Sequence, residues 1–359
     1  MEDHMNTTIL KQTYRILWRT KSICIAILLL LVGEAAVLSW SVWSYSVDGA
    51  CGFALQRSFS AVPFALPMFV YMGYELTVLF QEGFLWEKLA AGRHLDRAVG
   101  AIGVVLGTLV MGNLLLLLIF NTAFYTLCGK WYGAFYRNLF LSHLLYYGMT
   151  PLIGALVGIM LALYLKRKRI LVYLITIIFV LLNTGYVERI LEIPYAYGHQ
   201  AGTDALYAIK DFFTISPLNI KDNYSVEVIY GIPNEGVRWL LGLIWLSMTT
   251  GLIIYKILRP NWRKIVCIAV TGIVLLTAVV GYVPPGSRLL LDERPAGYCL
   301  NDQLYYTHAD YQPEISEDAG FDITSYEMEL WIHKTLKADV TMRLDLRQPG
   351  LEELYFTLS

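Results

Sequence analysis

The chain has 359 residues, of which 56% are hydrophobic and 16% charged, with a formal net charge of -1 and a mean hydropathy of +0.51. A soluble domain has charges at roughly 25% of its positions, and a chain of this length could not hide so much apolar surface from water. The composition therefore excludes an ordinary soluble protein and indicates a chain that uses lipid as a solvent.

Residues 1–21 are predicted to form a basic amphipathic helix on the cytoplasmic face. Leu10, Tyr14 and Leu17 share one helical face. On another face the basic residues recur at every fourth position: Lys11, Arg15 and Arg19. This pattern is typical of a helix that lies on the inner leaflet. A tail with accidental periodicity is the alternative, because the stripe covers only about two turns.

Seven apolar runs follow, each close to the roughly 20 residues that a helix needs to cross a bilayer. They are residues 22–43, 59–80, 98–124, 141–165, 170–186, 239–258 and 265–283. The predicted fold is therefore mainly α, a polytopic membrane bundle of about seven helices. Residues 22–258 form its six-helix domain, and residues 259–283 add an inner connection and the seventh span.

Basic residues in alternate connections give the predicted orientation. With the N-terminus inside, the inner connections hold 15 of the 28 lysines and arginines, and the first three outer connections hold seven over a longer stretch of chain. Since cytoplasmic connections carry the excess of basic residues, the N-terminus is predicted to be cytoplasmic and the C-terminus extracytoplasmic. The protein is expected in the cell membrane.

A few polar and small residues inside the spans are candidates for function or packing. Glu34, near the middle of the first span, lines a pathway or bonds to a neighbouring helix, and the sequence leaves both open. Glu75 lies near the inner end of its span, and Asn113 is a second intramembrane polar residue. Glycines four apart are expected to let helices approach closely. They are Gly103 and Gly107 in the third span and Gly154 and Gly158 in the fourth.

The inner connection after the second span reads Q-E-G-F-L-W-E-K-L-A-A-G-R and is predicted to be a short amphipathic helix. A transporter driven by a separate motor needs such a rigid cytoplasmic element, although an ordinary interfacial loop would have similar residues. The candidate coupling residues are Glu82, Gly83, Trp86, Glu87, Lys88, Gly92 and Arg93.

Residues 284–359 differ in character, because they hold 14 of the 29 acidic residues and no spanning run. Apolar residues alternate with polar ones from Tyr326 to Ile332 and from Val340 to Leu344, which predicts antiparallel strands with one apolar face. We expect a small extracytoplasmic β segment that further residues or another protein complete, because two or three strands are marginally stable alone.

Motifs for catalysis are missing from the sequence. It contains no H-E-x-x-H, no G-x-x-x-x-G-K-[ST] and no G-x-S-x-G, and its six histidines are scattered. We expect no catalytic residue, metal or cofactor in this chain, and no nucleic-acid partner. Five cysteines show no C-x-x-C spacing, and a bridge among Cys51, Cys128 and Cys299 stays open.

The N-terminal helix, the connection after the second span, the I-S-P-L-N-I stretch at 215–220 and the order of six spans resemble the membrane subunit of type 2 ABC exporters. The resemblance covers roughly residues 6–260. It implies a permease that couples through the 82–93 connection to a separate ATPase subunit at the cytoplasmic face. It also implies a homodimer or heterodimer of permeases in the lipid bilayer.

A second resemblance covers residues 325–346, which look like the opening strands of the N-terminal β-domain of aminopeptidase N type zinc peptidases. Some bacterial permeases carry such a domain after their spans. The peptidase catalytic part is not among these residues, so no zinc ligand can be assigned. Two alternatives to the permease stay open: a membrane anchor that presents an outer peptidase-like or binding domain, and a membrane sensor.

Overall fold

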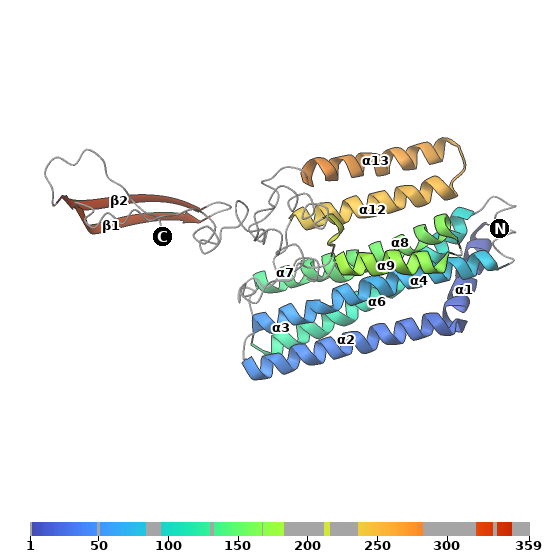
Figure 1. The fold of residues 1–359 in the computed structure, drawn as a ribbon, viewed down its shortest axis with the longest axis horizontal. Helices are drawn as coiled ribbons and strands as arrows, with labels where there is room; N and C mark the ends of the chain where they lie inside the picture. The colour runs from blue at the N-terminus through green and yellow to red at the C-terminus, as the bar shows by residue number, and fades with distance from the viewer. Residues whose placement is uncertain are drawn as a thin grey trace. The chain divides into compact units, whose positions relative to one another are not determined.

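The computed structural model describes residues 2–48, 51–83, 95–129, 133–166, 168–182, 212–215, 236–282, 321–332 and 336–346. The chain divides into two units, Met1–Leu289 with the helices and Leu290–Ser359 with the strands. Figure 1 labels the elements of both. The helical unit contains α1 (Glu2–Arg19), α2 (Lys21–Asp48), α3 (Cys51–Ser58), a 3₁₀ turn (Phe59–Ala61), α4 (Val62–Glu82), α6 (Leu95–Leu127), α7 (Gly133–His143), the π-helix η2 (Leu144–Met149), α8 (Thr150–Leu165), α9 (Arg169–Leu182), α12 (Gly236–Ile257) and α13 (Trp262–Tyr282).

Six of the predicted spans are confirmed as helices long and apolar enough to cross a membrane. They are Lys21–Ser44, Phe59–Glu82, Leu95–Leu127, Phe135–Leu165, Gly236–Ile257 and Trp262–Tyr282. These six helices are compatible with a multi-pass membrane protein. Many of their apolar side chains face outward, as Ile119 and Ile273 do with 66% and 64% of their surface exposed, which suits contact with lipid.

The predicted span at 170–186 is described only in part. Its helix α9 has 14 residues, which rise about 21 Å, short of the roughly 30 Å hydrocarbon core. The rest of that run, from residue 183, lies outside the described residues. The count of seven spans therefore stays a prediction, as does the orientation of the termini.

The N-terminal helix α1 crosses one end of the bundle (Figure 1) and packs on α6, α2 and α4. Its buried stripe is Ile9, Thr13 and Leu17, and the Tyr14 hydroxyl lies 2.9 Å from the Thr108 hydroxyl on α6. Lys11 and Arg15 are exposed on the other face. Protein therefore covers much of the apolar stripe that the sequence assigned to the inner leaflet.

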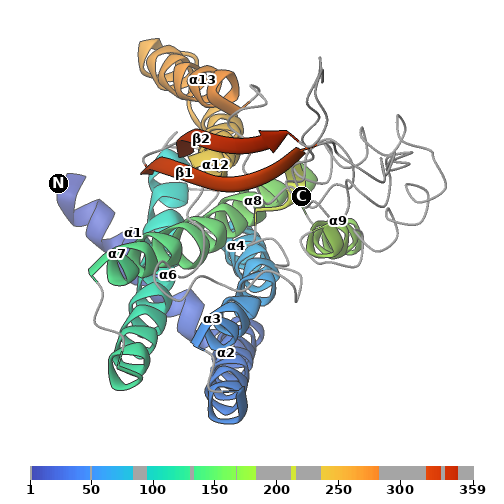
Figure 2. The same ribbon diagram turned by 90° about the vertical axis from the view of Figure 1, so that its left-hand side faces the viewer.

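The core of the unit lies around α4. Viewed along the helices in Figure 2, α4 lies among α2, α6 and α8, and α12 lies between α8 and α13. Buried residues of α1, α2, α4, α6 and α8 form one continuous cluster, and a second cluster joins α4, α8, α9 and α12. Helix α4 is therefore the element through which most of the bundle is connected.

The second unit contains a two-stranded antiparallel sheet of β1 (Phe321–Ile332) and β2 (Leu336–Leu346), as the alternating pattern predicted. Tyr326 pairs with Met342 and Met328 with Val340, so apolar residues pair with apolar residues. The register shifts between Ile323 and Ser325. This bulge moves odd-numbered Ile323 onto the face of even-numbered Tyr326, which keeps that face apolar.

Candidate functional site

The site begins where α4 ends, because the predicted coupling segment starts there. Gly83 ends the helix in an extended conformation, with φ -82° and ψ 144°, and its N–H donates to the Phe80 carbonyl over 3.2 Å. The chain leaves the helix at this residue. Of the predicted coupling surface, only Glu82 and Gly83 belong to the described residues. The other members, Trp86, Glu87, Lys88, Gly92 and Arg93, lie outside them.

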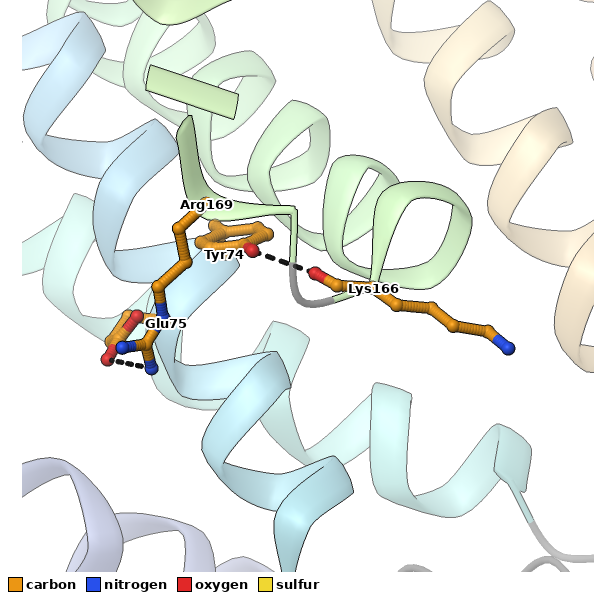
Figure 3. Close-up of polar contacts among 4 residues, drawn as sticks. All are labelled: Tyr74, Glu75, Lys166 and Arg169. Atoms are coloured by element: carbon orange, nitrogen blue, oxygen red, sulfur yellow. Dashed lines mark hydrogen bonds and ion pairs between the residues drawn. The ribbon is translucent and has the colours of Figure 1, made fainter. Parts of the chain in front are cut away.

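Two neighbouring side chains of α4 attach its last turns to the connection between α8 and α9 (Figure 3). The Tyr74 hydroxyl donates to the Lys166 carbonyl over 2.7 Å, and Arg169 Nη2 donates to Glu75 Oε1 over 3.2 Å. The second contact is also an ion pair between a buried carboxylate and a half-exposed guanidinium. Charge-assisted bonds of this kind are stronger than neutral ones. The pair places Glu75 in a structural contact at this end of the bundle.

Between Leu66 and Tyr74, the backbone of α4 packs closely against the backbone of α8. A Cβ atom added at Gly154 would lie 2.8 Å from the Leu66 carbonyl oxygen, and one added at Gly158 would lie 2.7 Å from the Tyr74 nitrogen. Gly73 approaches the Ala155 carbonyl in the same way from the opposite helix. The two backbones therefore touch, and α4 and α8 should move as one body.

The other predicted glycine pair has a different environment. A Cβ atom at Gly103 or Gly107 on α6 would meet nothing within 4 Å among the described residues. Spacing alone did not distinguish the two pairs, because each is four residues apart. The environment of Gly103 and Gly107 makes them a matched comparison for Gly154 and Gly158.

The intramembrane polar residues Glu34 and Asn113 are brought together by the fold. Asn113 Nδ2 on α6 donates to Glu34 Oε1 on α2 over 2.8 Å, and both side chains are buried. Glu34 Oε2 and Asn113 Oδ1 are buried without a hydrogen-bond partner in the described part of the chain. The pair thus joins two helices and retains two unused acceptor atoms in a region of low dielectric.

A second buried polar group was not singled out from the sequence. His143 Nε2 lies 2.8 Å from Asn121 Nδ2, and His143 Nδ1 lies 2.8 Å from the Leu139 carbonyl. Just after it, the π-helix η2 contains Tyr147, whose hydroxyl donates to the Ser58 carbonyl. π-Helices are rare and often lie near functional positions, but no short sequence motif predicts them.

Among the described residues, no group of three or more His, Cys, Asp or Glu side chains could hold a metal ion. Comparisons of the chain with family models, curated proteins and solved structures give no match.

The bond from Tyr74 to Lys166 predicts a measurable loss of stability in Tyr74→Phe. The substitution removes only the hydroxyl, so the expected cost is about 1 kcal/mol in the free energy of unfolding, measured by denaturation in mixed detergent micelles. Tyr71→Phe is the matched control, because Tyr71 is half-buried on the same helix and stacks on Tyr173. If the two variants have equal free energies of unfolding, the Tyr74–Lys166 hydrogen bond does not stabilise the attachment of α4.

Proposed function

We propose that the chain is the membrane-spanning permease subunit of an ABC-type exporter, which forms the translocation pathway and couples to a separate ATPase subunit. Two copies, or this chain and a related permease, would enclose the pathway. The observation that carries the proposal is the attachment of α4 to α8 and α9 beside the start of the 82–93 segment. A motor that displaced this segment would move a rigid pair of helices.

Three contacts support this mechanism. The glycine packing makes α4 and α8 one body, the Tyr74 hydroxyl holds the carbonyl that follows α8, and the Glu75–Arg169 ion pair holds the start of α9. Force applied at Glu82 would thus reach three helices within about two helical turns of Glu82. Helices α2 and α6, joined by Glu34 and Asn113, would form another side of the same bundle.

The proposal predicts a chain that hydrolyses no ATP alone and that changes the activity of a partner ATPase. Purified protein should be assayed for phosphate release alone and in complex with a candidate ATP-binding subunit. Glu87→Ala with Lys88→Ala should lower the activity of the complex at least five-fold. The control is Arg259→Ala with Arg263→Ala, exposed residues at the predicted inner connection after the sixth span. ATP hydrolysis by this chain alone would refute the proposal.

The β1–β2 sheet favours a second candidate, a membrane anchor that presents an outer peptidase-like or binding domain. Its apolar residues Ile323, Tyr326 and Met328 are exposed by 48%, 68% and 48%. A face of this kind suits packing against further protein. Deletion of residues 284–359 separates the candidates, because a permease without its tail should still alter the activity of its ATPase partner, whereas an anchor should lose all function.

A further inference from the structure

A pocket of about 450 Å³ lies at the ends of α4, α6, α8 and α12, beside the Tyr74–Lys166 contact. Val78 and Leu163 contribute to its apolar wall, together with residues of α6 and α12. Its polar residues are Gln81, Glu82, Lys166 and Lys256. The lining of the pocket therefore combines apolar side chains with two cations.

The two lysines come from helices far apart in the sequence. In Figure 3 the Lys166 side chain extends away from Tyr74 and Glu75. The Lys256 ammonium lies 5.5 Å from the centre of the Tyr164 ring, a cation–π contact that holds it beside α8. Glu82 is the one acid among the described residues that line the pocket, so two cations face one carboxylate.

Lys166 also has an unfavourable backbone conformation. Its φ is 51° and its ψ is -122°, a combination that glycine adopts readily and that is strained for other residues. A glycine here would relieve this strain but would remove the ammonium group.

The predicted orientation places this pocket at the inner membrane interface. All of its helix ends adjoin connections that the basic residues assign to the cytoplasmic side. At that depth the ammonium groups of the two lysines would lie among lipid headgroups and the apolar wall beside acyl chains. Basic pockets between helix ends on this side suit anionic headgroups.

We propose that this pocket binds the phosphate headgroup and upper acyl chains of an anionic glycerophospholipid from the inner leaflet. The ammonium groups of Lys166 and Lys256 would bind the phosphate, and Val78 and Leu163 would contact the chains. The proposal depends on the predicted membrane orientation and not on coupling to an ATPase, so the ATPase assay and lipid binding can fail separately.

Native mass spectrometry of the full chain in detergent tests the proposal, with phosphatidylglycerol and phosphatidylcholine as probes. Phosphatidylglycerol should bind at least ten-fold more tightly, and Lys166→Gln with Lys256→Gln should abolish that preference. Arg259→Gln with Arg263→Gln removes the same charge from exposed positions on the same predicted face and should leave the preference within two-fold. Equal losses in both double variants would overturn the site.

Two single variants separate binding from folding. Lys166→Gly should raise the melting temperature, because strain is relieved, while it weakens phosphatidylglycerol binding. Glu82→Gln should tighten binding, because it removes the opposing charge. Weaker binding in Glu82→Gln would contradict the electrostatic basis of the proposal.

Free glycerol phosphate distinguishes a lipid site from a simple phosphate site. At millimolar concentration it should not displace phosphatidylglycerol, because it lacks the acyl chains that contact the apolar wall. Full displacement at that concentration would overturn the lipid assignment.

Discussion

Gly158→Ala should destabilise the helical unit strongly. The added methyl group would meet backbone atoms of Val70 and Tyr74, which cannot rotate away as a side chain can. Overpacking of this kind costs about 1–3 kcal/mol, and the upper end is expected here because two helix backbones would have to separate. The midpoint of unfolding in mixed detergent micelles should fall accordingly. The same separation should weaken the coupling between α4 and α8. In the proposed complex, the activity of the ATPase partner should therefore fall.

Gly103→Ala is the matched control for this prediction. It makes the same chemical change inside another span, where a Cβ atom meets nothing within 4 Å among the described residues. Alanine also has the better helix propensity, by about 1 kcal/mol, so a small gain in stability is expected. A Gly158→Ala protein as stable as Gly103→Ala would show that the close approach of α4 and α8 is wrong.

Asn113→Leu should lower the free energy of unfolding by about 1–2 kcal/mol, because it removes the donor that Glu34 Oε1 accepts from. Glu34→Leu with Asn113→Leu should recover most of this loss, since it replaces both buried polar groups of the pair by apolar ones and leaves neither without its partner. Unfolding of the four proteins of this double-mutant cycle gives the interaction energy directly.

The same cycle decides between the two roles that the sequence left open for Glu34. If Glu34 only joins α2 to α6, the double variant should recover both its stability and the stimulation of the proposed ATPase partner. If Glu34 lines the pathway, the double variant should recover its stability but should no longer stimulate the partner. Additive effects of the two single substitutions would contradict the hydrogen bond itself.

Much of the fold could be predicted from the sequence because a bilayer imposes a strong constraint on each segment by itself. A backbone in hydrocarbon must satisfy its hydrogen bonds within its own helix, so a long apolar run such as 98–124 predicts a span without knowledge of its neighbours. The β1–β2 sheet was predicted for a related reason, since its two-residue alternation is a local property. The bulge at Thr324 was not predicted, because it depends on pairing with β2.

The candidate site depended much more on tertiary structure. The sequence showed Glu34, Asn113 and Glu75 as polar residues in unfavourable surroundings, but their partners lie 79 and 94 positions away and had no local signal. It showed two glycine pairs with identical spacing, and only the packing of α4 on α8 distinguished them. The pocket between Lys166 and Lys256 likewise exists only because α8 and α12 end side by side.

The sequence by itself thus determined where six helices long and apolar enough to cross a membrane lie, and that residues of the tail form two antiparallel strands. Solvent preference and hydrogen-bond periodicity act over a few turns, and a linear pattern contains both. Only the tertiary structure decided which polar groups meet and which helices touch, because contacts between distant residues depend on the packing of whole helices.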